Sequence, residues 1–337
     1  QTTGYEKPYY TNVNYPYPVD PPYVPDDNPC GVYQRAFEIA SKWGKVYFGL
    51  EGVSSCAYVS INGQYVGFTM GSHLRAEFDI TDFVVDGVNR MDVLVLKWCA
   101  GSYLEDQDKL RYTGIFRDVY ILSRPVGHIE DYHITADMNG VLTFTLNRGD
   151  EATIKFEGKT LVAKQGKPVK ITVKNVELWS AEKPRLYNLI IEAKGEVILE
   201  RVGFKSVYRE GKVFYFNGEK IKLLGVNRHD NHPYNGQTVT REDMINDLKL
   251  MKFLNINCIR TSHYQSCPEF YQLCDEYGFY VVSESDLEGH GVQSKSVKSG
   301  RDGEREYSDI AFSGEFYQTS AQRQEVNILA HFNRPSI

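Results

Sequence analysis

The chain has 337 residues, of which 42% are hydrophobic and 24% are charged, and its formal net charge at pH 7 is −6. This composition is typical of a globular protein of two or three domains and differs from that of disordered chains. Mean hydropathy is −0.42, and no apolar run approaches the roughly 20 residues that cross a bilayer, so we expect no membrane span. The acidic balance without long basic runs argues against a nucleic acid partner.

The six cysteines show no C-x-x-C pair and no regular spacing. We therefore predict free, mostly buried thiols in a reducing compartment, which favours a cytoplasmic protein. Residues 1–7 also lack the basic and apolar pattern of a signal peptide.

Residues 5–29 hold seven of the thirteen prolines, interleaved with tyrosines. Proline fixes φ and biases the preceding residue toward extended conformations, so this segment must run extended. We predict an ordered arm packed across a domain; a proline-rich ligand for a recognition module is the weaker alternative. The high content of tyrosine, 24 residues in all, suits sugar stacking and β-sheet cores equally.

Two all-β blocks follow the arm. Residues 32–122 read as short strands separated by turns, with Asn62-Gly63 as a two-residue hairpin turn, and predict a β-sandwich or jelly roll within a first domain of residues 1–125. Residues 126–210 repeat this pattern at the size of an immunoglobulin-like sandwich. Pro125 marks the predicted boundary between them.

Residues 211–337 alternate strands and helices. After a hairpin turn at Asn217-Gly218, a strand ends near Asn227, and Thr240 with Asp243 forms a capping-box signal for a helix. Further strands are predicted at 257–262 and 279–285, with a helix at 268–278 between them, then a long loop and a helix at 315–332. The order is that of a (β/α)8 barrel or a doubly wound sheet. Three strands cannot close a barrel, so we expect the domain to be incomplete.

Ionisable side chains follow each of the three predicted parallel strands. These residues are Arg228, His229, Asp230 and His232 after the first strand, Arg260 and His263 after the second, and Glu284, Asp286, Glu288 and His290 after the third. In α/β barrels the carboxyl ends of the strands form the active-site face. Three equivalent clusters therefore predict a polar active site.

Three patterns are compatible with cation sites but leave the ion open. Glu288 and His290 are two residues apart, a spacing that lets them share a metal, with the carboxylate favouring Mg²⁺ and the imidazole favouring Zn²⁺ or Mn²⁺. His229-x-x-His232 is a weak zinc signal because it lacks the H-E-x-x-H pattern. The acidic loop at residues 105–108 is either a solvated turn or a ligand for sugar hydroxyls or a hard cation.

Five stretches together resemble glycoside hydrolase family 2, and within it the large β-galactosidases. They occur in the family's order over nearly the whole chain and read YTNVNYPYPVDPPYVPDDNPCGVY, GSYLEDQDKLRYTGIFRDV, GVNRHDNHP, IRTSHYQSCPEFYQLCDEYGFYVV and DLEGHG. The resemblance implies a jelly-roll sugar-binding domain, an immunoglobulin-like sandwich and the first part of a (β/α)8 TIM barrel. It also implies retaining hydrolysis of terminal β-galactosides such as lactose, by an oligomer when the chain is complete.

The resemblance also implies roles for individual residues. Asn12 and Asp108 would reach galactose from the first domain, and Asp108 would help hold Na⁺. His229 and His263 would contact galactose hydroxyls and stabilise the transition state. Arg260 would orient the nucleophilic carboxylate, and Glu288 with His290 would bind Mg²⁺.

The two catalytic carboxylates cannot be assigned in these 337 residues, because in the family both follow a motif like the final NRPSI. We therefore expect a β-galactosidase chain that is inactive by itself and whose N-terminal segment is also missing. The alternatives are a non-catalytic sugar-binding or assembly subunit, a β-glucuronidase-like relative in the same family, and a metal-dependent hydrolase using His229, His263 and His290.

Overall fold

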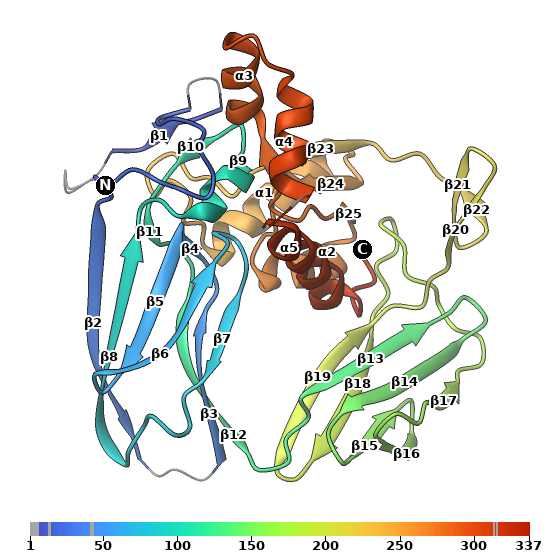
Figure 1. Cartoon of the computed structure of the whole chain (residues 1–337). Coiled ribbons are helices and arrows are strands. Elements are labelled where there is room, and N and C mark those ends of the chain that lie inside the picture. Colours follow the sequence, from blue (N-terminus) through green and yellow to red (C-terminus); the bar gives the residue numbers. More distant parts are fainter. Residues whose placement is uncertain (1–6, 13–14, 41–43, 313, 315) are drawn as a thin grey trace.

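The computed structural model describes residues 7–12, 15–40, 44–312, 314 and 316–337. Two β-sandwiches lie side by side, and a part with parallel strands and helices lies above and between them (Figure 1). The predicted fold class, a jelly roll, an immunoglobulin-like sandwich and part of a TIM barrel, is confirmed. Residues 5, 6, 13 and 14 of the predicted arm, and residue 315 at the predicted start of the last helix, lie outside the described residues.

The jelly roll packs two main sheets around an apolar core. One sheet has the order β2 (Cys30–Ile39), β8 (Gly87–Leu96), β5 (Cys56–Ile61) and β6 (Gln64–Met70), and the other β12 (Val119–Pro125), β3 (Gly44–Leu50) and β7 (Ala76–Asp79). Short pairs add β4 (Val53–Ser54) to β11 (Gly114–Ile115), and β1 (Tyr9–Tyr10) to β10 (Leu110–Arg111). The predicted Asn62-Gly63 turn joins β5 to β6 with both residues at positive φ, as this hairpin type requires.

The immunoglobulin-like part also has two antiparallel sheets. The first contains β13 (Asp131–Ala136), β14 (Val141–Arg148) and β17 (Val169–Thr172), and the second β16 (Lys159–Lys164), β15 (Glu151–Phe156), β18 (Tyr187–Ala193) and β19 (Glu196–Val202). Alternate side chains point inward, so Leu142, Phe144 and Leu146 of β14 are all buried in the core between the sheets. A small sheet of β20 (Val207–Glu210), β21 (Val213–Phe216) and β22 (Glu219–Lys220) leads onward.

The barrel part contains three adjacent parallel strands, β23 (Gly225–Arg228), β24 (Cys258–Thr261) and β25 (Tyr280–Val282). Helices α1 (Arg241–Phe253) and α2 (Pro268–Tyr277) connect them. The predicted capping box is present, since Thr240 and Asp243 bond reciprocally at the start of α1. Gly278 ends α2 in the left-handed conformation that glycine tolerates.

The predicted long loop between the strand at 279–285 and the last helix is wrong. The chain instead forms β26 (Glu288–Gly289), α3 (His290–Lys298) and α4 (Gly303–Phe312) before α5 (Phe316–His331). Neither α3 nor α4 has a strong local signal, and their apolar residues are few. They are stabilised by tertiary packing, because Val292 and Ile310 join a cluster that includes Tyr15 and Tyr17 of the arm.

The N-terminal arm is ordered where the structure describes it. Tyr15 and Tyr17 are buried, and the Tyr17 ring lies edge-on to Trp98 with 5.1 Å between centroids. Tyr15 stacks on Tyr103 of η1 (Ala100–Leu104) at 5.7 Å. These tyrosines therefore pack the arm between the jelly roll and the α3–α4 hairpin, where they serve a structural role.

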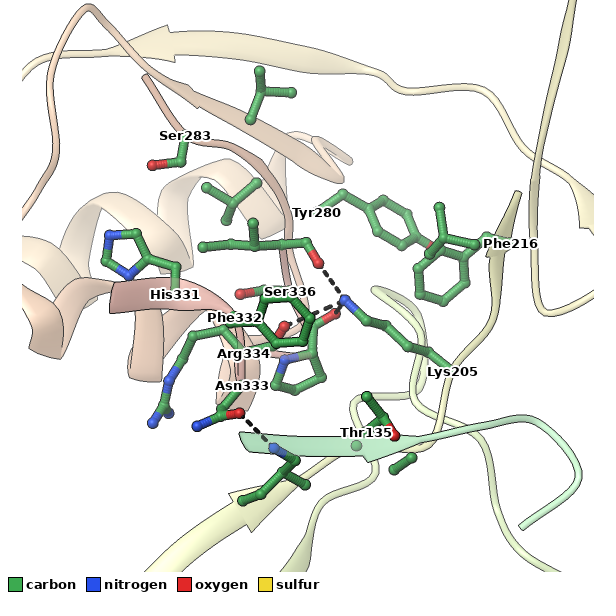
Figure 2. A pocket seen from close by; sticks show the side chains of 18 of the residues that line it. Thr135, Lys205, Phe216, Tyr280, Ser283, His331, Phe332, Asn333, Arg334 and Ser336 are labelled. Carbon is green, nitrogen blue, oxygen red and sulfur yellow. Dashed lines mark hydrogen bonds between the residues drawn. The ribbon is translucent and has the colours of Figure 1, made fainter. Parts of the chain in front are cut away.

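A cavity of about 660 Å³ lies between β13, the C-terminal residues and β25. On one side of it Lys205 donates from Nζ to the Pro335 carbonyl at 2.8 Å, and the Asn333 amide oxygen accepts from the Ile134 N–H at 2.8 Å (Figure 2). None of the predicted site residues is among the described residues that line it. All six cysteines are free and four are buried, as predicted. In the described part of the chain, no helix is both long enough and apolar enough to span a bilayer.

Candidate active site at the barrel–jelly-roll junction

The predicted clusters after β23, β24 and β25 meet at one edge of the parallel sheet. The His229 and His263 rings lie 5.8 Å apart. His263 Nδ1 lies 2.8 Å from Glu284 Oε2 and 3.3 Å from Glu288 Oε2. Parallel strands end on the same side of the sheet, which brings together residues separated by up to sixty positions.

Glu284 is the site residue to which we assigned no role from sequence. Its carboxylate accepts a hydrogen bond from Arg260 Nε and lies against His263, so it joins two of the predicted residues. Arg260 in turn places a guanidinium nitrogen 3.1 Å from His263 Nδ1. The sequence feature that could have identified Glu284 is its position two residues beyond the end of β25.

Glu288 and His290 are in direct contact, with 2.6 Å between Oε1 and Nδ1. They belong to different elements, because Glu288 is in β26 and His290 begins α3. Burial is the main cause that raises the pKa of Glu288, with His263 and His290 acting in the opposite direction. A cation bound there would offset that desolvation.

No three His, Cys, Asp or Glu side chains of the described residues are grouped so as to hold a metal ion. Glu288 and His290 nevertheless fit a divalent cation that keeps most of its water ligands, as Mg²⁺ commonly does. One of the two donors is a carboxylate oxygen, and the other is a ring nitrogen of the exposed His290 side chain.

The jelly roll contributes the opposite wall of the site. A cavity of about 180 Å³ is shared by its residues Asp108, Lys109, Leu110 and Tyr112 and by the barrel residues His229, Asp230, Asn231 and Gln237. Two predicted sugar-binding residues, Asp108 and His229, therefore line the same hollow from different domains. Tyr10 of the arm donates a hydrogen bond from its hydroxyl to Asp108.

Asn12 is not brought into this cavity. Asn12 is not among the described residues that line the hollow. Its amide nitrogen is buried and has no hydrogen-bond partner among the described residues. The neighbouring Thr11 packs close to Gly291 at the start of α3. The structure thus places Asn12 near the junction but leaves its predicted sugar contact as a prediction.

His229 is set up to act as a neutral imidazole. Burial, together with the nearby Lys109 ammonium and His263, lowers the pKa of His229 to about 4. Its Nδ1 is buried without a partner among the described residues. A neutral imidazole ring that lines a cavity can exchange a hydrogen bond with a ligand hydroxyl.

Lys109 lines the cavity, but its ammonium group is directed elsewhere. Its Nζ lies 2.9 Å from His73 Nε2 and 4.1 Å from the centre of the Tyr264 ring. Burial lowers the pKa of Lys109 to about 8. The Lys109 ammonium group therefore contacts residues of the domain junction and is not the main charge of the cavity.

The site is held together across the domain junction by buried polar contacts. The residues after β23 are anchored by Arg117 of the jelly roll, which donates to Asp230 Oδ2 at 3.0 Å and to the Gln265 carbonyl at 2.6 Å. The residues after β25 are anchored by a short parallel pairing of β26 with β9 (Glu105–Asp106). Both anchors connect the jelly roll with a barrel loop that carries site residues.

Comparison with known proteins agrees with this arrangement. Three models of glycosyl hydrolases family 2 match the chain. The sugar binding domain matches residues 1–125 and the TIM barrel domain matches residues 207–337. A third model, described only as glycosyl hydrolases family 2, matches residues 128–205. A β-galactosidase of Actinobacillus pleuropneumoniae is 43% identical over 88% of this chain and 31% of its own length. One of Staphylococcus xylosus is 40% identical over 99% of this chain and 35% of its own length. The chain thus spans about a third of these curated relatives.

Solved structures show the same fold. A Faecalibacterium prausnitzii β-glucuronidase matches with a TM-score of 0.76 at 20% identity, covering 90% of this chain and 57% of its own. A family 2 β-galacturonidase from Eisenbergiella tayi matches with a TM-score of 0.71 at 24% identity, covering 91% of this chain and 56% of its own. With the three family models matching consecutive parts from residue 1 to residue 337, the chain belongs to glycosyl hydrolases family 2.

Proposed function

We propose that the protein containing this chain hydrolyses terminal β-D-galactosides with retention of configuration. The observation that carries the proposal is the cavity shared by Asp108 and His229, which combines an acceptor carboxylate with a neutral imidazole. Such a pair suits the hydroxyls of an uncharged sugar. The similarity to proteins named β-galactosidase at 40–43% identity supports the substrate class.

A uronic acid substrate, as the names of the solved relatives suggest for those proteins, fits this cavity less well. A sugar carboxylate would require a free cation, and Lys109 is engaged by His73 and Tyr264. The Asp108 carboxylate would also repel a sugar carboxylate in the same hollow, and the charge of Asp230 is already paired with Arg117 and Arg228. The charges of the cavity therefore favour a galactoside over a glucuronide.

Within the proposed mechanism, residues of this chain bind and orient the sugar. His229 and His263 hydrogen-bond hydroxyls and strengthen those bonds as the oxocarbenium-like transition state forms, and Asp108 accepts from a further hydroxyl. Arg260, which Glu284 holds, orients the nucleophilic carboxylate. Retaining hydrolysis needs two carboxyl groups about 5 Å apart, and we assign neither role to a residue of this chain.

Two cations belong to the proposal. Mg²⁺ would be held by Glu288 and His290 and would supply positive charge beside the reacting sugar; Na⁺ would be held with the help of Asp108. The supporting observations are the 2.6 Å approach of the Glu288 and His290 donors and the exposed position of the Asp108 carboxylate. A cytoplasmic location and a homo-oligomeric assembly are further proposals that follow from the cysteine content and from the family.

The test is to assay the full-length protein on nitrophenyl β-D-galactoside and β-D-glucuronide. We expect kcat/KM to be at least about 100-fold higher for the galactoside, and His229→Gln to lower it at least about 10-fold. Equal or higher activity on the glucuronide would contradict the substrate assignment. Full activity of the 337-residue chain alone would contradict our expectation that both carboxylates lie outside it.

A further inference from the structure

Glu288 owes its position to a pairing between two domains. It lies in β26, and β26 pairs in parallel with β9 of the jelly roll, so that Glu288 is opposite Glu105 and Gly289 is opposite Asp106. Each strand has only two residues. A pair this short is not stable through its own backbone hydrogen bonds, so other groups must hold it.

Arg323 of α5 contacts both sides of this pair, and the Asp106 carboxylate, which accepts from the Gly291 N–H, is a second link between them. The Arg323 side chain is completely buried, with one guanidinium nitrogen 2.6 Å from Glu105 Oε1. The other terminal nitrogen donates to the Asp286 carbonyl at 2.7 Å and lies 3.4 Å from Asp286 Oδ2. One planar guanidinium thus holds β9 and the residue that leads into β26.

Asp286 adopts a backbone conformation that needs such support. Its φ is +58°, in the left-handed region that costs a non-glycine residue roughly 1 kcal/mol or more. Gln107 donates to its carboxylate, and the His73 N–H donates to Asp286 Oδ2 at 3.2 Å. This turn sets the direction of residues 287 and 288, and therefore of the Glu288 side chain.

The charges around Arg323 make its guanidinium hard to replace. Glu105 and Asp286 are both almost fully buried, and burial of an unpaired carboxylate is costly. Arg111 lies 3.7 Å from Glu105 and so offsets part of that charge. A lysine at position 323 would supply a charge, but a point charge cannot donate in two fixed directions.

We propose that Arg323 is a positioning residue that fixes Glu288 in the active site by clamping β9 to the turn at Asp286. The inference rests on the proposed function, because Glu288 is assigned there as a cation ligand. Arg323 itself touches neither His263 nor His290 among the described residues, so it acts through the backbone that carries Glu288.

The test compares Arg323→Lys with Arg334→Lys in the full-length protein. Arg334 is a matched control, since its guanidinium also forks between two carboxylates, Glu200 and Asp275, but at the junction with the immunoglobulin-like part. The probe is Mn²⁺ alone, with free Mn²⁺ measured by electron paramagnetic resonance. Hydrogen exchange of the amides at 288 and 289 is followed in parallel.

We expect Arg323→Lys to weaken Mn²⁺ binding at least about 10-fold and to accelerate exchange at 288–289, as when a ligand's supporting contacts are lost. Excess Mg²⁺ should restore its kcat. Arg334→Lys should change neither readout, even where it lowers Tm by a similar amount. If Arg323→Lys fails to fold, Gln107→Leu, which removes one support of Asp286 without leaving a new buried charge, should weaken Mn²⁺ binding about 3-fold.

The outcomes separate this inference from the proposed function. Equal Mn²⁺ affinity in wild type and Arg323→Lys would overturn the positioning role while leaving galactoside hydrolysis intact. A wild-type protein that hydrolyses galactosides but binds no Mn²⁺ would overturn the metal assignment and this inference with it. If Arg323→Lys lowers Mn²⁺ affinity but the wild-type protein does not hydrolyse galactosides, the positioning role would be supported and the proposed substrate overturned.

Discussion

The barrel part meets its two neighbours in different ways. Its junction with the jelly roll is built from buried charges, with Arg323 between Glu105 and Asp286, and Arg117 against Asp230. Its junction with the immunoglobulin-like part is centred on an aromatic group. There the completely buried Trp179 packs against Phe216 and Tyr280, and Arg334 pairs with Glu200 across the same junction.

The difference indicates that the two junctions have different roles. Removing charges from water is costly, so a buried ionic junction is an inefficient way to stabilise a fold. A buried ionic junction does fix the relative orientation of the groups that it joins, because each guanidinium has a rigid set of donors. The charged junction lies where Asp108, His229 and Glu288 must be oriented, and the aromatic junction lies away from them.

The largest expected effect comes from breaking the aromatic junction. Trp179→Ala should lower the free energy of unfolding by about 3–5 kcal/mol, because it removes a fully buried ring and its Nε1–H bond to the Asp275 carbonyl at 2.9 Å. Urea unfolding measures the loss, with Tyr208→Ala at an exposed position as the control. Galactoside affinity of the folded variant should be unchanged; a large loss of affinity would remove the distinction between the junctions.

A second variant breaks the charged junction. Arg117→Ala should destabilise the protein by about 3 kcal/mol, because it leaves the buried Asp230 without one of its two guanidinium partners. It should also weaken galactoside binding at least about 10-fold, since Asp230 follows His229 directly.

Arg124→Ala is the matched control for this experiment. Arg124 likewise bonds one carboxylate and one carbonyl, those of Glu196 and Ile129, but between the jelly roll and the immunoglobulin-like part. It should cost about 1 kcal/mol and leave galactoside affinity unchanged. Equal effects of the two variants on affinity would contradict a special role for the charged junction.

A smaller effect concerns pH and the packing behind β25. Burial and the nearby Arg334 lower the pKa of His331 from 6.5 to about 4. Between these values the unfolded chain binds a proton that the folded chain does not, so stability falls as pH decreases from 6.5 to 4. The contribution is at most about 1.4 kcal/mol per pH unit.

His331→Gln should remove this contribution and flatten the dependence of unfolding free energy on pH in that range. Urea titrations at several pH values measure the slope. The dependence of galactoside affinity on pH should not change, because His331 lies in the packing behind the strands, against the Tyr271 ring at 3.9 Å. An unchanged stability slope would show that His331 is protonated normally in the folded protein.

Much of the site could be predicted because local signals specify it. The Asn62-Gly63 turn, the capping box at Thr240 and the glycine at 278 define where elements begin and end. Parallel strands then bring the residues that follow them to one edge. His229, His263 and Glu288 therefore converge as the strand pattern predicts.

The rest depends on contacts between distant parts of the chain. The pairing of β9 with β26 joins segments about 180 residues apart, and two-residue strands carry no periodicity. Helices α3 and α4 were missed for the same reason, since packing against Tyr15 and Tyr17 stabilises them. In the sequence, nothing distinguishes Arg323 from other residues of a helix. Its position between two carboxylates follows only from its burial and its contacts in the structure.

The most direct test of a sugar site shared by two domains is a double-mutant cycle on galactoside binding. Isopropyl thio-β-D-galactoside is titrated calorimetrically into the full-length wild type, Asp108→Asn, His229→Gln and the double variant. We expect each single variant to weaken binding at least about 10-fold, and the two effects to be coupled by at least about 0.5 kcal/mol, because both side chains line one cavity. Unchanged affinity in Asp108→Asn, or strictly additive effects, would contradict a site built jointly by the jelly roll and the barrel.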